Sequence, residues 1–332
     1  MEEAKRIIND IKKGSIKPIY FFTGDEPYYI DFLSNFIEKN LLTEDEKAFN
    51  QMVLYGQDVT INDIVSNAKR YPMMAERQVI IIKEAQELAK TIENLESYVE
   101  NLQPTTVLVL NYKYKNLDKR KKLYKAIKEK GVIFESKKLY ENKVGAWIQK
   151  TLANNGHGIS LKAASMLVEF LGNDLSKISK ELEKLTQIVK QGQEITPELI
   201  EENIGISKDF NNFELQKAIG SKDIKKSFAI ANYFAQNPKS NPLVVTVGNL
   251  YRFFSLVLKY HALKSKSDAP KVLGVAPFFV KEYELAARNY PMKKISAVIA
   301  KIREIDMKSK GVGAANISDG ELLRELLVAI YD

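Results

Sequence analysis

The chain has 332 residues, of which 45% are hydrophobic and 28% charged, as in globular proteins of about two or three domains. It contains no cysteine, which excludes disulfides, thiolate zinc sites and cysteine nucleophiles. With only His157 and His261 available, neither a histidine metal site nor a Ser-His-Asp triad is expected, so we predict no metal and no catalytic residue. The formal net charge of +8 fits nucleic acid or acidic partners, and equally a lysine-rich surface.

The sequence shows no feature of a membrane protein. No apolar run approaches the roughly 18–20 residues that a bilayer-spanning helix needs. The first residues, MEEAKRIINDIKKG, form a charged amphipathic pattern rather than a signal peptide. We therefore expect a cytoplasmic protein that makes no contact with a membrane.

The first 140 residues alternate short apolar runs with helical patterns. The expected strands are residues 17–23, 49–55, 78–82, 105–110 and 132–134. The expected helices are residues 27–40, 61–70, 93–102 and 118–130. Strands that alternate with helices predict a doubly wound parallel sheet.

From about residue 141 a helical period replaces the strand patterns, and we expect no further strands. The expected helices are residues 144–154, 161–171, 174–190, 197–203, 213–219, 224–235, 243–263, 277–288, 292–309 and 319–330. The GVGAAN run at 311–316 follows a helix and lacks a third glycine, so we interpret it as an interhelical loop. The predicted organisation is an α/β domain (1–140), a small helical domain (141–207) and a larger one (208–332), with a connector near 205–211.

A phosphate-binding loop would lie where the first strand ends, at Gly24, and the next helix begins. Such a loop needs G-x-x-x-x-G-K-[ST], which supplies amides and a lysine to the phosphates and a hydroxyl to magnesium. The sequence here is GDEPYYID, which has one glycine and no Gly-Lys-Ser/Thr. Asp25 and Glu26 stand where phosphates would approach and would repel them.

The strand VIIIKE shows a second departure from an ATPase. An ATPase of this layout ends this strand with Asp-Glu, which hold magnesium and polarise water. Lys83 replaces the aspartate and leaves Glu84 alone. We therefore predict a degenerate nucleotide site without function, no ATP hydrolysis and no bound cofactor.

The residues Tyr71, Pro72, Met73 and Met74 lie between a short helix, which Pro72 ends or bends, and a buried strand. Two adjacent methionines at such a junction cannot both face the core easily, and methionine is common at adaptable binding surfaces. The residues alone favour core packing for at least one methionine. A binding surface is the alternative.

The segment 113–130, KYKNLDKRKKLYKAIKEK, is strongly basic and carries interleaved tyrosines. One interpretation is a solvated helix face, and the other is a contact to phosphates or to an acidic partner. The candidates for facing DNA are Lys119, Arg120, Lys121 and Lys122.

Five segments in a fixed order carry a family resemblance over essentially the whole chain. They are PIYFFTGDEPYYID, RYPMMAERQVIIIKEA, FLGNDLSKISKELEKL, DFNNFELQKAIGSKD and LGVAPFFVKEYELAARNY. In these segments the chain resembles the delta subunits of the bacterial DNA polymerase III clamp loader. The resemblance implies an AAA+-like α/β domain with a degenerate nucleotide site, a three-helix lid and an all-α C-terminal collar.

The resemblance also implies a function in DNA replication. Delta subunits bind the beta sliding clamp and open one of its interfaces or hold it open. Sister subunits of the gamma/tau and delta-prime types handle ATP, and the assembled complex acts on primed DNA. The protein would thus belong to a DNA-directed DNA polymerase, a nucleotidyltransferase, without a catalytic site or small-molecule substrate of its own. The family's clamp contact is a pair of hydrophobic residues just before the strand, here Met73 and Met74, with Tyr71 and Pro72 setting their angle.

Two other interpretations stay open. An ATP-hydrolysing AAA+ loader, such as a gamma-type or delta-prime-like subunit or a helicase loader, would need the phosphate-binding lysine. A helical scaffold or DNA-binding protein unrelated to clamps would leave the buried parallel strands unexplained. We expect a monomer, because a delta-type subunit needs no self-association.

Overall fold

The computed structural model describes residues 2–205, 207, 209–275, 277–313 and 317–332. Backbone contacts divide the chain into two compact units, Met1–Leu139 and Tyr140–Asp332. The further boundary expected near residue 207 stays a prediction. Each unit is described by itself below.

The N-terminal unit is built on a five-stranded sheet in the order β2-β3-β4-β1-β5, in which every neighbouring pair is parallel. The strands are β1 (Ile19–Gly24), β2 (Gln51–Tyr55), β3 (Gln78–Lys83), β4 (Thr106–Lys113) and β5 (Val132–Ser136). Strands β1, β3 and β4 are apolar and buried along nearly their whole length, as strands covered on both faces must be. The doubly wound parallel sheet predicted from the sequence is confirmed.

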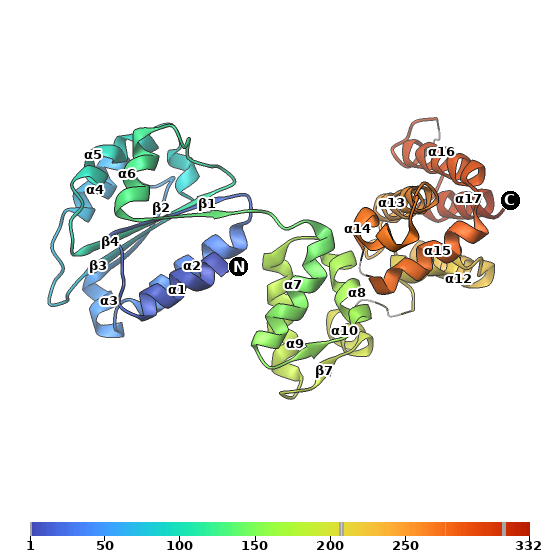
Figure 1. Ribbon diagram of the computed structural model, residues 1–332, viewed down its shortest axis with the longest axis horizontal. Coiled ribbons are helices and arrows are strands. Elements are labelled where there is room, and N and C mark those ends of the chain that lie inside the picture. The colour runs from blue at the N-terminus through green and yellow to red at the C-terminus, as the bar shows by residue number, and fades with distance from the viewer. Residues whose placement is uncertain (1, 206, 208, 276, 314–316) are drawn as a thin grey trace. The chain divides into compact units, whose positions relative to one another are not determined.

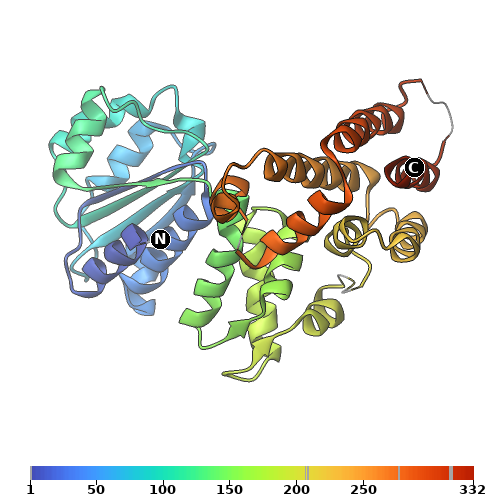
Figure 2. The same ribbon diagram turned by 45° about the vertical axis from the view of Figure 1, so that its right-hand side comes forward.

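Helices cover both faces of this sheet. They are α1 (Glu2–Lys12), α2 (Pro27–Asn40), α3 (Glu44–Asn50), α4 (Ile61–Ala68), η1 (Ala85–Leu88), η2 (Ile92–Leu95), α5 (Glu96–Glu100) and α6 (Lys122–Lys130). In Figures 1 and 2, α1 and α2 lie on one face of the sheet, and α4, α5 and α6 lie on the other. The core on the α4–α6 side includes the fully buried Ile64, Leu108 and Leu123.

Two α-helices of the N-terminal unit begin later than the pattern predicts. The helix expected over 118–130 begins at Lys122, because Asp118 holds a turn instead: its carbonyl accepts from the Lys121 N–H at 3.0 Å and its carboxylate from the Arg120 N–H at 3.0 Å. The helix expected over 93–102 is a 3-10 turn, η2, followed by α5.

The helix α3 was not expected, because 49–55 read as one apolar run. Asn50 ends α3, and β2 begins only at Gln51. Thr43 and Glu46 form a capping box at its start, in which Thr43 accepts from the Glu46 N–H at 3.4 Å and Glu46 from the Thr43 N–H at 2.9 Å. The T-x-x-E spacing of this box was the signal in the sequence.

The first part of the C-terminal unit holds α7 (Glu141–Asn154), α8 (Leu161–Leu171), α9 (Leu175–Ile188) and α10 (Pro197–Ile204). These match the four helices read from the pattern, one more than the three that the resemblance implies. The expectation that no strands occur here is wrong: β6 (Gly158–Ile159) and β7 (Glu194–Ile195) form a parallel pair. Strands of two residues are too short to show an alternating pattern.

The remainder of the C-terminal unit is helical. Its elements are α11 (Asn212–Gly220), α12 (Ile224–Gln236), α13 (Leu243–His261), η3 (Lys266–Asp268), α14 (Ala269–Leu273), η4 (Pro277–Phe279), α15 (Val280–Asn289), α16 (Met292–Ser309) and α17 (Asp319–Tyr331). Their shared core contains the fully buried Phe254 and Leu326. Residues 266–273, for which the sequence predicts no helix, carry η3 and α14. Gly311–Gly313 follow α16, as an interhelical loop requires, whereas 314–316 lie outside the described residues. No helix in the described ranges is long and apolar enough to cross a membrane.

Candidate functional site

The segment Tyr71–Met74, called the tip below, joins α4 to β3 at the N-terminal edge of the sheet. Its large side chains are exposed: Tyr71 by 78%, Met73 by 62% and Met74 by 104%. The interpretation that at least one methionine packs in the core is therefore wrong. Met74 has φ 52°, in the left-handed region that residues other than glycine seldom adopt.

The backbone of the tip is held by one buried side chain, Asn50, which is only 4% exposed. Its Oδ1 accepts from the Met73 N–H at 2.6 Å, and its Nδ2 donates to the Met73 carbonyl at 2.9 Å. A third bond, from Nδ2 to the Glu46 carbonyl at 3.1 Å, fixes the amide against α3. The methionine side chains are thus exposed on a backbone that is anchored to the neighbouring segment.

The base of the tip is anchored as well, because α4 ends at Ala68 and its last carbonyls need partners. Nε2 of Gln78 donates to the carbonyls of Asn67 at 3.1 Å and Arg70 at 2.7 Å. Thr106 Oγ1 donates to the Ala68 carbonyl at 2.8 Å. Side chains from β3 and β4 thereby replace the helix bonds that Pro72 prevents from continuing.

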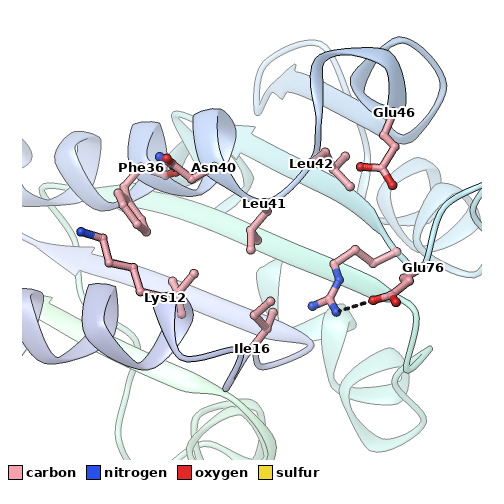
Figure 3. A pocket seen from close by; sticks show the side chains of 10 residues that line it. Lys12, Ile16, Phe36, Asn40, Leu41, Leu42, Glu46 and Glu76 are labelled. Carbon is pink, nitrogen blue, oxygen red and sulfur yellow. Dashed lines mark hydrogen bonds and ion pairs between the residues drawn. The ribbon is translucent and has the colours of Figure 1, made fainter.

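A cavity of about 420 Å3 lies on the same edge of the sheet. Figure 3 shows the side chains that line it. Glu46 of α3 and Glu76, which follows the tip, lie on one side of it, and Lys12 of α1 and Phe36 and Asn40 of α2 lie on the other. Arg77 pairs with Glu76 at 3.4 Å. Charges of both signs at this cavity give no preference for an anion or a cation.

At the opposite edge of the sheet, β1 ends where a phosphate loop would begin. Two N–H groups of this loop are occupied: that of Gly24 donates to the Lys115 carbonyl at 3.1 Å, and that of Glu26 to the Ser136 carbonyl at 3.2 Å. Gly24 has φ 118°, and a Cβ there would lie 2.1 Å from the Ser136 carbonyl oxygen. The loop is therefore closed against β5 rather than open to a ligand.

The start of α2 is also occupied. Glu26 is 3% exposed, and its Oε1 accepts from the Tyr28 N–H at 3.1 Å as the cap of this helix. A helix N-terminus attracts anions, and here the protein's own carboxylate takes that place. Asp25, by contrast, is exposed.

The ends of β3 and β4 carry internal ion pairs. Lys83 Nζ lies 3.1 Å from Oε2 of Glu38 on α2. Lys113 Nζ lies 2.7 Å from Glu84 Oε1 and 2.9 Å from Asp31 Oδ1. Sequence reasoning found Lys83 and Glu84 but not their partners, which come from distant segments.

The pKa values of this group follow from its contacts. Burial acts to raise the pKa of Glu84, but hydrogen bonds from Lys113 and Gln86 outweigh it and hold that pKa below its ordinary value. Burial acts to lower the pKa of Lys113, but its bonds to Glu84 and Asp31 raise it overall. Both groups stay charged at neutral pH and neutralise each other.

Three of the four basic candidates are engaged in ion pairs. Lys119 lies 3.0 Å from Glu135, Lys122 lies 3.8 Å from Glu96, and Arg120 pairs with Asp118 at 2.8 Å.

The hydrogen bonds from Arg120 lower the pKa of Asp118 to about 2. Lys121 makes no ion pair within the part of the chain that the structure describes.

In the same ranges, no three acidic or histidine side chains gather in a way that could hold a metal.

Comparisons with known proteins agree with this arrangement. The sequence model of the family "DNA polymerase III, delta subunit" matches residues 20–137, which include both the tip and the closed loop. DNA polymerase III subunit delta of Bacillus subtilis (strain 168) is 27% identical over 330 residues, which cover 96% of this chain and 94% of that protein.

Among solved structures, the Bacillus subtilis DNA clamp loader delta protein aligns with 99% of this chain and 100% of its own, at 24% identity and a TM-score of 0.57. The Thermotoga maritima RuvB Holliday junction branch migration motor aligns with 87% of the chain at a TM-score of 0.40, too low to bear on function.

The fold is therefore that of the solved clamp-loader delta protein, with a parallel-sheet domain followed by helices. The family match over residues 20–137 and the 27% identity to subunit delta over nearly the whole chain make the protein similar to DNA polymerase III delta subunits. The resemblance read from the five sequence segments is confirmed.

Proposed function

We propose that this protein is the clamp-loader subunit that grips the beta sliding clamp and opens one of its interfaces or holds it open. Sister ATPase subunits of the gamma/tau and delta-prime types supply the chemical energy, and the assembled complex loads the clamp on primed DNA. In this proposal the part of the chain from 141 to 207 serves as a lid and the part from 208 to 332 as a collar that joins the subunits.

The observation that carries the proposal is the tip: three large side chains, Tyr71, Met73 and Met74, exposed on an anchored backbone. Exposed apolar clusters on a monomer mark interaction sites, because their contact with water is unfavourable until a partner covers them. Met73 and Met74 are flexible and polarisable, so they adapt to an apolar pocket. The two positions coincide with the hydrophobic pair to which the family resemblance assigns clamp contact.

The closed nucleotide loop supports the division of labour. An ATP-hydrolysing loader would need free loop amides and a lysine for the phosphates. Here the N–H groups of Gly24 and Glu26 bond to other strands and loops of the same domain, and the Glu26 carboxylate caps α2. No observation favours the ATPase alternative.

The tip can supply much of the binding free energy. Covering a methionine side chain contributes about 1.5–3 kcal/mol, so the pair contributes about 3–6 kcal/mol before ordering costs. An anchored backbone reduces those costs. We therefore expect the two methionines to dominate the interface.

The test is a titration of the isolated chain against the beta clamp. The Met73→Ala/Met74→Ala variant should bind at least about 100-fold more weakly, a loss of about 2.7 kcal/mol. The matched control is Met292→Ala/Met307→Ala, which removes two exposed methionines of the C-terminal unit and should leave the affinity unchanged. Equal affinities of the tip variant and wild type would refute the assignment.

The proposal also includes a contact between the basic segment 113–130 and DNA in the assembled loader. Of Lys119, Arg120, Lys121 and Lys122, Lys121 is free to meet a phosphate without first breaking an ion pair described above. A Lys121→Glu change should reduce DNA-dependent clamp loading and the salt sensitivity of DNA binding by the assembled loader. If both stay at wild-type level, this segment is a solvated helix face.

A further inference from the structure

The end of α3 lies against the tip although 23 residues separate Asn50 from Met73 in the chain. Asn50 is the last residue of α3, and Phe49 immediately precedes it. Phe49 is 73% exposed, close to the exposure of Tyr71. Two segments, one from each side of β2, thus present large apolar side chains to solvent at one edge of the sheet.

The link between these segments is a pair of hydrogen bonds to the backbone of one residue. An asparagine amide has two N–H donors and one carbonyl acceptor, and Asn50 uses both kinds of group. One N–H donates to the Met73 carbonyl, the other to the Glu46 carbonyl, and Oδ1 accepts from the Met73 N–H. Because Asn50 is buried, water does not compete for these bonds, and their loss would leave polar groups without partners.

The bonds from Asn50 lower the entropic cost of binding a partner at the tip. If the tip were a free loop, binding would have to order it at a cost of about 1–2 kcal/mol for each residue fixed. Here the bonds from Asn50 fix Met73 relative to α3 before any partner arrives. Phe49 immediately precedes Asn50, so Phe49 and the two methionines are exposed on two segments that these bonds link.

We propose that Asn50 is a positioning residue that holds the tip in its clamp-binding shape, and that Phe49 is a further contact to the same clamp. This inference rests on the proposed function. The partner is a protein surface with an apolar pocket for the methionines and an apolar rim that receives the Phe49 ring. Aromatic side chains at such a rim contribute contact area at a low entropic cost.

The role of Asn50 is tested with Asn50→Ala in a double-mutant cycle with Met74→Ala, read by clamp affinity. We expect Asn50→Ala to weaken binding about 10-fold in the wild-type background and less than about 3-fold beside Met74→Ala. Equal losses in both backgrounds, or no loss in the first, would overturn the positioning role.

Hydrogen exchange gives a second readout, specific to position. The Met73 amide should exchange about 10-fold faster in Asn50→Ala, whereas the amides of Ile80 and Ile81 in β3 keep their protection. Should Asn50→Ala fail to fold, Asn50→Asp carries the same test, because it keeps the acceptor and loses both N–H donors. Unchanged exchange at Met73 in the folded variant would refute the inference.

The contact role of Phe49 is tested with Phe49→Ala, which removes an exposed ring and should leave the fold intact. We expect about 5–10-fold weaker clamp binding, against no change for the matched control Tyr114→Ala, an exposed aromatic after β4. If Met73→Ala/Met74→Ala loses affinity while Phe49→Ala and Asn50→Ala do not, only this inference fails. If the methionine variant keeps its affinity, the proposed function fails.

Discussion

The carboxyl and amino edges of the parallel sheet differ in the side chains that they carry. At the carboxyl edge, where β1, β3, β4 and β5 end, polar groups face one another: Lys113 meets Asp31 and Glu84, and the Gly24 and Glu26 amides meet carbonyls. At the amino edge, before β2 and β3, large apolar side chains are exposed beside the charged cavity: Phe49, Met73 and Met74. Open α/β sheets bind ligands at the carboxyl edge.

This difference shows how a fold typical of nucleotide-binding domains can serve to position a binding surface. The carboxyl edge is closed by the protein's own carboxylates, lysines and carbonyls, so its residues contribute to stability. The amino edge carries side chains that have no role in the core. A substitution at the first edge should therefore change the free energy of unfolding, and one at the second should change affinity for the clamp.

The largest effect on stability should follow from Gly24→Ala. A Cβ at this position would collide with the Ser136 carbonyl, and φ 118° is open to glycine but not to alanine. We expect a loss of about 3 kcal/mol or more in the free energy of unfolding, measured in urea. The folded fraction should keep its clamp affinity. A variant as stable as wild type would contradict the closed-loop geometry.

A smaller effect should follow from Lys113→Met, which keeps the apolar stem of the side chain and removes its charge. Glu84 and Asp31 then lose a shared partner but stay partly solvated, so we expect a loss of about 1 kcal/mol at pH 7.

The loss should depend on pH in a stated direction. Because the folded pKa of Glu84 lies below its ordinary 4.5, its pairing stabilises the fold above pH 4.5 and ceases to do so as pH falls through the folded pKa. Because the pKa of Lys113 is raised from 10.5, its contribution is complete below that pH and is lost as pH rises through the folded pKa. Thermal unfolding from pH 3 to 7 should show wild type and Lys113→Met converging in acid. A constant difference would contradict the pairing.

The tip should show the reverse behaviour. Met74→Ala removes a side chain that is fully exposed, so the free energy of unfolding should change by less than about 0.5 kcal/mol even though clamp affinity falls. Urea unfolding of the purified variant measures this. A large loss of stability would mean that Met74 packs against the domain, and the contrast between the edges would weaken.

The smallest expected effect is that of ATP. The loop amides of Gly24 and Glu26 are engaged, and the Glu26 carboxylate at the start of α2 would repel a triphosphate. Thermal unfolding of the isolated chain should not shift with millimolar ATP and magnesium. A rise in the unfolding temperature would show that the carboxyl edge opens.

Much of this arrangement was predictable from local sequence. The buried strands, the missing phosphate lysine and the tip at Tyr71–Met74 depend on residues close together in the chain. Asn50 and Lys113 could not be assigned roles in this way, because their partners lie 23 and 29 residues away and meet them only in the fold. The exposure of both methionines could not be predicted from the sequence either, because hydrophobic side chains between a helix and a buried strand fit core packing equally well.

The bonds from Asn50 have a consequence for how this surface can change over time. They reach only the amide and carbonyl of residue 73, groups that every residue except proline offers in the same form. The chemical identity of the side chains at 73 and 74 is therefore not constrained by the link that holds them. Substituted side chains at these two positions would be exposed on the same anchored backbone. The binding surface can therefore change with its partner, or come to fit another one, without a change of fold.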